Sequence, residues 1–389
     1  MARALAGVFL TFLRLGCMSF GGPVAHLGYF REAFVRRLAW LDDDAFAECV
    51  AIAQLLPGPA SSQTGMLIGW NRAGFGGAFA AWLGFTLPSA VAMTAAALLL
   101  PRASGDGGWL AGLLVVAVGV VADAIVSMRA RLAPDAPRIA IALAIFVVLA
   151  IAPRAWMAWL APSAIAAGAI AGALGLHATT GATRSTLHLR ATRAGGLVAL
   201  GLFLLALAAL PFVARTGVPG ALCARFFGIG SVVFGGGHVV LPLMQSQLIS
   251  DGLTTQKTLL AGYAAAQAMP GPLFSIAAYV GAGVDGVRGA LVATAAIFAP
   301  SFFLLAAIVP FYSAVAGNAR VRAALAGANA GVVGLLAAAF VTPIWTSAIR
   351  TPADLAGAGV AYVALAVFRV PPWIVVLAGL TAGAANLLA

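Results

Sequence analysis

Long apolar runs, separated by short polar stretches, make up most of this sequence. The runs are continuous and do not alternate with polar residues, which favours membrane-spanning helices over the strands of a β-barrel. In the N-terminal part, we expect apolar helical segments over residues 5–28, 45–70, 73–100, 109–128, 139–152 and 155–176. In the C-terminal part, we expect them over residues 224–248, 259–283, 289–312, 323–345, 355–368 and 372–388. One further run, 194–213, has no partner in the first set.

Two of these segments contain the same interruption, a Pro-Gly-Pro motif preceded by glutamine. The first is Gln54-Leu55-Leu56-Pro57-Gly58-Pro59 and the second is Gln267-Ala268-Met269-Pro270-Gly271-Pro272. Proline lacks a backbone N–H and disfavours helical geometry in the residue before it, so neither helix continues through the motif. The freed backbone groups need protein, water or a ligand around them, and each glutamine is placed to bond either those groups or the ligand. Two such breaks at matching places in two half-chains indicate a transport site.

Further motifs recur in the same order, which indicates an internal duplication. The series Phe12-x-x-x-Gly16-x-x-x-Phe20-Gly21-Gly22 returns 214 residues later and ends there as Phe234-Gly235-Gly236. The Pro-Gly-Pro motif returns after 213 residues, and Pro88-Ser89 returns after 212 as Pro300-Ser301. The predicted domains are an N-terminal membrane repeat (1–176), a polar basic linker (177–193), an unpaired connecting helix (194–213) and a C-terminal membrane repeat (214–389).

These features predict an all-α polytopic membrane protein of two homologous six-segment repeats, with about 11–13 membrane segments. An unpaired helix between the repeats inverts the second repeat in the membrane, an arrangement found in many secondary transporters. If the two Pro-Gly-Pro segments instead enter and leave on one side, the repeats are parallel. The distribution of Lys and Arg among the loops favours neither arrangement.

The composition narrows the class of protein further. Hydrophobic residues form 62% of the chain and charged residues 8%, whereas soluble proteins carry about 25% charged residues. The net charge of +11 comes from 22 Lys and Arg against 11 Asp and Glu. We interpret this excess as loop charge that orients the helices and attracts the lipid bilayer. The basic residues are spread over short loops, which argues against nucleic-acid binding. The three cysteines are scattered, which argues against a disulfide framework and a zinc site.

The residues that follow each Pro-Gly-Pro motif are suited to binding an oxyanion. A helix that restarts there exposes unpaired N–H groups and about half a positive charge, so we expect bare amides at both breaks. The alternative for the hydroxyl groups is back-bonding to a carbonyl one turn earlier, and for the glycines it is close helix packing. The candidate substrate-binding residues are Arg14, Gly21, Gly22, His26, Gln54, Pro57, Gly58, Pro59, Ser61, Ser62, Gly235, Gly236, His238, Gln267, Pro270, Gly271, Pro272 and Ser275.

Arg14 and two histidines are the basic or titratable members of this set. An arginine inside an apolar segment costs at least a few kcal/mol unless it faces a cavity or a partner. Arg14 therefore contacts the anion, pairs with Glu48 or Asp123, or extends to the membrane surface. His26 and His238 are candidates for proton coupling or anion contact, with a hydrogen-bonded structural role as the alternative.

An enzymatic interpretation finds little support. Asp42-Asp43-Asp44 resembles the acidic clusters that hold magnesium, but no second cluster accompanies it. Capping of a helix that begins near Ala45 explains the run more simply. The sequence has no nucleotide-binding Gly-Lys-Ser/Thr loop. We therefore expect a transporter without a cofactor or a resident metal, and not an enzyme.

The motifs together resemble the chromate ion transporter family in its long, two-domain form. The resemblance rests on Phe20-Gly21-Gly22-Pro23-Val24-Ala25-His26, on Phe234-Gly235-Gly236-Gly237-His238 and on both Pro-Gly-Pro motifs, and it covers essentially the whole chain. It implies a bacterial inner-membrane transporter that exports chromate and lowers its toxicity. It also implies oppositely oriented homologous halves, with sulfate as a similar ion, and a homo-oligomer is compatible with it.

Energetics favour export of such an ion. Moving one charge across 100 mV is worth about 2.3 kcal/mol, so a dianion that leaves a negative interior gains roughly twice that. This is equivalent to about a thousandfold gradient without any proton coupling. The alternative function is transport of sulfate or another oxyanion, inward and coupled to protons.

Overall fold

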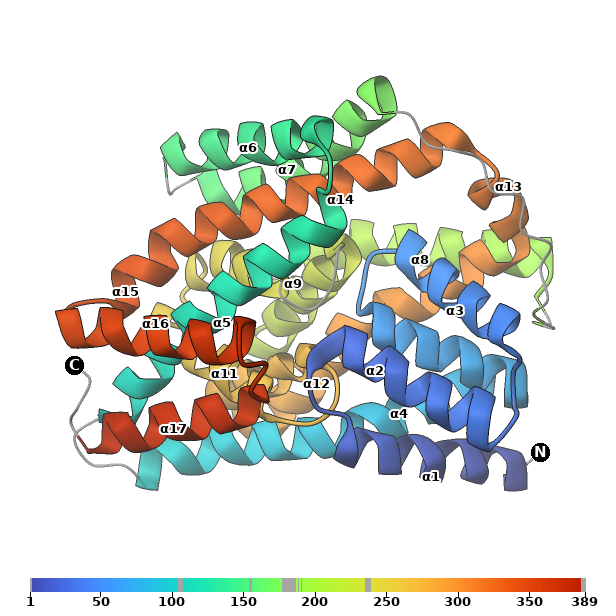
Figure 1. Cartoon of the computed structure of the whole chain (residues 1–389). Coiled ribbons are helices and arrows are strands. Elements are labelled where there is room, and N and C mark those ends of the chain that lie inside the picture. The colour runs from blue at the N-terminus through green and yellow to red at the C-terminus, as the bar shows by residue number, and fades with distance from the viewer. Residues whose placement is uncertain are drawn as a thin grey trace.

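The computed structural model describes residues 2–103, 108–153, 156–176, 187, 189, 191–234 and 239–385, and in these ranges it contains helices and no strands (Figure 1). The helices before the middle of the chain are α1 (Ala2–Met18), α2 (Gly22–Phe30) with its π-helical extension η1 (Arg31–Arg37), α3 (Asp43–Leu55), α4 (Ala60–Ala103), α5 (Gly108–Leu132), α6 (Ala136–Ile151) and α7 (Met157–Gly175). The apolar run predicted over residues 194–213 forms helix α8 (Arg193–Val213).

The later helices follow the same order. They are α9 (Val218–Val232), α10 (Val240–Met244) with η4 (Gln245–Ile249), α11 (Gln256–Ala268), η5 (Leu273–Ser275), α12 (Ile276–Ile308), η6 (Val309–Phe311), α13 (Tyr312–Ala316), α14 (Ala319–Ala339), η7 (Phe340–Trp345), α15 (Thr346–Ala348), α16 (Pro352–Ala366) and α17 (Pro372–Ala384). Five helices of the described chain are long and apolar enough to cross a membrane, and several shorter apolar helices accompany them. The chain is therefore an all-α polytopic membrane protein, as the sequence predicts.

Side-chain caps explain where several of these helices begin. The Asp42 carboxylate accepts the N–H of Ala45 at 2.7 Å and so starts α3, which confirms the capping interpretation of the acidic run. The Thr255 hydroxyl accepts the N–H of Thr258 at 3.2 Å and so starts α11. Thr351 and Asp354 form a reciprocal capping box at the start of α16. These polar caps fix the boundaries of helices whose interiors are almost wholly apolar.

The long helices α4 and α12 each reverse direction at a glycine. Gly74 in α4 has φ 68° and Gly286 in α12 has φ 58°, values that glycine adopts at little cost. On either side of the first turn, a side chain at Gly69 would overlap the carbonyl of Gly77, so the two arms of α4 pack directly against each other. The predicted boundary between residues 70 and 73 is confirmed as this turn.

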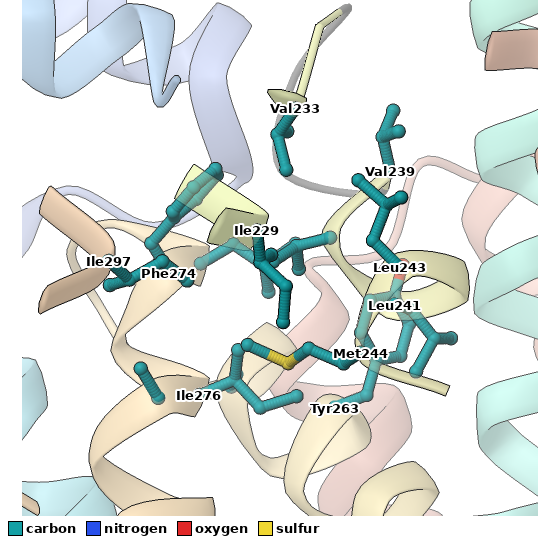
Figure 2. Close-up of a cluster of buried hydrophobic side chains, with 14 of the residues drawn as sticks. Ile229, Val233, Val239, Leu241, Leu243, Met244, Tyr263, Phe274, Ile276 and Ile297 are labelled. Atoms are coloured by element: carbon teal, nitrogen blue, oxygen red, sulfur yellow. The ribbon is translucent and has the colours of Figure 1, made fainter. Parts of the chain in front are cut away.

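Helices from the two ends of the chain interleave. α14 packs against α6 and α7, while α5 packs against α16 and α17. Figure 1 shows α14 beside α6 and α7 along one side of the molecule. Glycines permit the closest approaches, because a side chain at Gly112 of α5 would overlap the Gly379 carbonyl of α17. A buried apolar cluster lies between α9, α10, α11 and α12 (Figure 2), and it includes Ile229, Met244 and Tyr263.

Candidate functional site

Both Pro-Gly-Pro motifs are loops that interrupt helices, as predicted. α3 ends at Leu55 and α4 begins at Ala60, while α11 ends at Ala268 and η5 begins at Leu273. Gly58 has φ 123° and Gly271 has φ 98°, which places both in the region that favours glycine. We call residues 56–59 the first loop and residues 269–272 the second loop.

Each loop is hydrogen-bonded to the opposite half of the chain. The N–H of Gly58 donates to the carbonyl oxygen of Val233 at 2.6 Å, and the N–H of Gly271 donates to that of Ser19 at 2.9 Å. Ser19 directly follows α1 and Val233 directly follows α9, and they are matching positions of the sequence repeat. We call these two contacts the cross-half bonds. They differ from the expectation of bare amides, since the central amide of each loop has a protein partner.

A second pair of reciprocal contacts brings hydroxyl groups onto the loops. A β-carbon added to Gly58 would lie 2.7 Å from the Ser301 hydroxyl, and one added to Gly271 would lie 2.9 Å from the Ser89 hydroxyl. The side-chain amide of Gln63 donates both to the Pro57 carbonyl at 2.6 Å and to the Ser301 hydroxyl at 3.1 Å. The recurring Pro-Ser motif draws attention to Ser89 and Ser301 in the sequence. The repeat alone does not predict that each of them faces the loop of the other half.

His26 connects the break after α1 to the start of α4. It is buried, with Nε2 3.1 Å from the Ser19 carbonyl oxygen and Nδ1 3.2 Å from the Ser61 hydroxyl. A carbonyl oxygen only accepts, so Nε2 carries the hydrogen and, in the neutral ring, Nδ1 accepts from Ser61. The Phe85 ring packs edge-on against the His26 ring, with 5.2 Å between the two ring centroids. The Ser19 carbonyl therefore accepts from both His26 and the second loop.

Several buried polar atoms beside the loops have no hydrogen-bond partner in the described part of the chain. The Ser62 and Ser275 hydroxyls each belong to the third residue after the last proline of a loop, and both are unpaired. Thr64, by contrast, back-bonds to the Ala60 carbonyl at 2.8 Å, as the alternative interpretation of the hydroxyls predicts. Other unpaired atoms at this site are Ser19 Oγ, Gln63 Oε1 and Thr86 Oγ1. Nearly all buried polar groups in proteins are paired, so this group of unpaired atoms supports the loops as the candidate site.

The space at the second loop is small in this conformation. A cavity of about 10 Å³ is lined by Gly21, Gly22, Ala266, Gln267, Met269, Gly271 and Leu273. Such a cavity holds about one water molecule and is too small for a tetrahedral oxyanion. The structure is therefore closed around its candidate site.

Comparison with known proteins places this architecture in a family. The model of the chromate transporter family matches residues 6–176 and 220–384, one match in each half. The chain belongs to the chromate transporter family. It is a transporter and not an enzyme.

Relatives of this transporter match along most of its length. A chromate transport protein of Pseudomonas aeruginosa is 28% identical over 356 residues, which cover 90% of this chain and 83% of the relative. A chromate transport protein of Cupriavidus metallidurans is 25% identical over 368 residues, covering 90% and 85%. An uncharacterized transporter of Methanocaldococcus jannaschii is 26% identical over 348 residues, covering 85% and 82%. No solved structure matches the chain.

Other candidate residues of this transporter are not gathered at the loops. Arg14 is exposed on α1 and has no hydrogen bond or ion pair among the described residues, so it pairs with neither Glu48 nor Asp123. Glu48 instead is buried and accepts the N–H of Leu187 at 3.2 Å. Gln54 is exposed at the end of α3. The candidates Gly235, Gly236 and His238 lie outside the described residues, as does most of the predicted linker.

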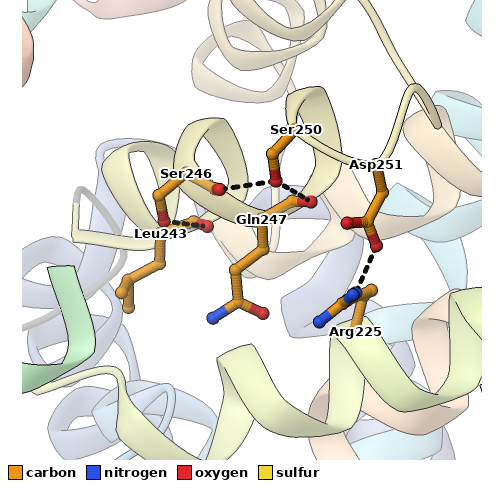
Figure 3. A network of polar contacts seen from close by, with 6 residues as sticks. All are labelled: Arg225, Leu243, Ser246, Gln247, Ser250 and Asp251. Carbon is orange, nitrogen blue, oxygen red and sulfur yellow. Dashed lines mark hydrogen bonds and ion pairs between the residues drawn. The ribbon is translucent and has the colours of Figure 1, made fainter. Parts of the chain in front are cut away.

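Ion pairs of this transporter lie at the ends of helices, away from the loops. Arg31 and Asp43 are 2.7 Å apart, and this hydrogen bond lowers the pKa of the exposed Asp43 carboxyl. Arg225 of α9 pairs with Asp251 (Figure 3). Asp251 follows Ser250, the residue at the end of η4. Within the described residues, no three His, Cys, Asp or Glu side chains gather as metal ligands.

Proposed function

We propose that this transporter exports chromate across the cytoplasmic membrane of a bacterium and thereby confers chromate resistance. The family match and the chromate transport proteins among its relatives support the substrate. The negative interior of the cell supports the direction, since it drives a dianion outward. We further propose that the two halves are inverted repeats and that the anion moves by alternating access between them.

The cross-half bonds are the observation that carries the proposed mechanism. Each loop is bonded to the break after the first helix of the other half, through Ser19 on one side and Val233 on the other. Two equivalent contacts related by the repeat give the molecule two equivalent ways to open. Breaking one bond while the other holds frees one loop at a time, which is what alternating access requires.

The freed groups supply a binding site for a tetrahedral oxyanion. When a cross-half bond breaks, the N–H of Gly58 or Gly271 needs a new acceptor, and an anion oxygen provides one. The unpaired hydroxyls of Ser62 and Ser275 stand beside the loops as further donors. At the start of α4, the first-turn N–H groups have no carbonyl within the helix and carry the positive end of its dipole. The anion therefore replaces protein contacts and stabilises the open loop.

Flux in inside-out membrane vesicles tests this function. In such vesicles, export appears as uptake of radiolabelled chromate into the lumen, and a lumen-positive potential is expected to accelerate it several-fold. Collapse of the potential with an ionophore is the control. Uptake that occurs only in right-side-out vesicles, or that does not respond to the potential, would overturn the proposed direction. Competition by excess sulfate shows whether the two dianions share the site.

A further inference from the structure

One acidic side chain lies within a membrane-spanning helix of this transporter. Asp123 belongs to α5, about 9 Å along the helix axis from Arg129, the first basic residue of its last turn. It is half-buried and has no hydrogen bond or ion pair among the described residues. A carboxylate at such a depth is costly and is kept when it has a function. Nothing in the cross-half bonds or the loop contacts uses it.

A short series of polar groups connects Asp123 to the second loop. α5 packs against α11, whose end leads into that loop. The charge of Asp123 acts on the hydroxyl of Tyr263, a fully buried residue of α11. That hydroxyl is hydrogen-bonded to Gln267, one helical turn later on the same face. Gln267 in turn lines the small cavity together with Gly271.

The connection exists at one loop only. The residue that matches Tyr263 in the first repeat is Val50, which has no polar atom in its side chain, although Gln54 matches Gln267. A search for residues that recur in both repeats does not find Tyr263, because the matching residue in the first repeat is different. A polar residue that is present in only one half of a duplicated site indicates a role other than binding the anion at two equivalent loops.

Few other charges act on Asp123. The elements packed against α5 are α11, α14, α15, α16, α17 and η7. Their charged or titratable residues are Lys257 and Tyr263 of α11, Arg320 and Arg322 of α14, and Asp354 and Tyr362 of α16, with Arg129 and Arg131 on α5 itself. Asp354 already accepts the N–H groups of Arg350 and Thr351. Arg131 and Tyr263 are the groups that interact with Asp123.

We propose that Asp123 binds a proton that travels with the anion, and that Tyr263 and Gln267 are positioning residues that transmit its charge state to the second loop. This inference rests on the proposed chromate transport. An ionised carboxylate on α5, which packs against α11, disfavours a doubly negative anion at the second loop, and protonation removes the repulsion. Proton binding and anion binding therefore favour each other. Carriage of both in the same direction follows from that mutual preference, so that one net negative charge leaves the cell with each chromate and its proton.

Proteoliposomes with the membrane potential clamped at zero test the proposal. For the wild type, a pH gradient that is acidic on the chromate side is expected to accelerate radiolabelled chromate flux several-fold, with protons moving in the same direction. Asp123→Asn is expected to lose this acceleration but to keep chromate exchange at equal concentrations, because Asn resembles the protonated carboxyl. Asp44→Asn is the matched control, since Asp44 is exposed outside the apolar segments and takes part in none of the contacts described above. Effects of pH on the anion itself are shared by all three proteins.

The possible outcomes separate the two proposals. If the wild type moves no chromate, the proposed function fails. If it moves chromate without any response to the pH gradient, or if Asp123→Asn responds as the wild type does, the proton proposal alone fails. Loss of exchange in a folded Asp123→Asn protein also overturns it. Tyr263→Phe is expected to retain exchange while its response to the pH gradient falls, and Asp123→Glu is expected to restore the response.

Discussion

At the scale of single residues, the most informative feature is unused hydrogen-bonding capacity. Ser62 and Ser275 occupy matching positions after the two loops, are buried, and have unpaired hydroxyls within the described chain. An unsatisfied buried polar group costs roughly 1–3 kcal/mol. We propose that the substrate supplies the missing acceptor at both positions during transport.

The double variant Ser62→Ala with Ser275→Ala tests this explanation. We expect its thermal unfolding midpoint in detergent to be unchanged or higher, because two unsatisfied groups are removed. We expect chromate flux at low concentration to fall about tenfold or more, since each lost charge-assisted hydrogen bond is worth roughly 1.5–3 kcal/mol. Ser231→Ala is the matched control: its hydroxyl is buried but bonded to the Phe227 carbonyl at 2.8 Å. That variant is expected to be slightly less stable and to transport normally. Unchanged flux in the double variant would contradict the assigned role.

At the scale of elements, the two arms of α4 depend on glycine for two different reasons. Gly74 has a positive φ at the turn, with open space where a β-carbon would stand. Gly69 is an ordinary helical residue whose added side chain would overlap the carbonyl of Gly77 in the facing arm. The same arrangement occurs in α12, with Gly286 at the turn and Gly281 facing Gly289. The turn and the close contact therefore contribute separately to the stability of each pair of arms.

Alanine substitutions separate these two contributions. Gly74→Ala is expected to cost roughly 1–3 kcal/mol, because φ 68° with ψ −169° is a conformation that essentially only glycine adopts. Gly69→Ala is expected to cost more, because the facing backbone must move before the methyl group fits. Thermal unfolding of the purified variants in detergent measures the difference. A larger loss for Gly74→Ala than for Gly69→Ala would show that the arms are not closely packed.

The sequence predicts these elements well and their partners poorly. The breaks at Pro57 and Pro270 and the span of α8 follow from local chemistry, since proline stops a helix wherever it stands in one. The contact between Gly58 and Val233 joins residues far apart in the chain, and no local pattern specifies it. The central amide of each loop is not bare for this reason, because its partner comes from the other half. The exposure of Arg14 could not be predicted either. Its position within a run of apolar residues does not say which side of the helix faces the protein.

At the scale of the whole molecule, neither half completes its own packing. α14 from the second half packs against α6 and α7, and α5 from the first half packs against α16 and α17. Both loops also take their cross-half bonds from the opposite half. The family matches stop at residue 176 and resume at residue 220, so the connecting region lies outside both. The contacts between the halves therefore contribute directly to holding the molecule together.

Expression of the chain as two pieces, 1–182 and 183–389, tests this conclusion. Each piece alone exposes small-residue helix faces that need a partner, so we expect little of either to accumulate in membranes and no chromate resistance. Coexpressed pieces are expected to copurify and to restore most of the chromate flux, since every interleaved contact can still form. Gly112→Leu in the first piece, which places a large side chain against the Gly379 carbonyl, is expected to prevent copurification. Leu10→Ala, at an exposed position of α1, is the control for substitution alone. Accumulation of one piece as a folded, active transporter would mean that the halves function independently and that the cross-half bonds are dispensable.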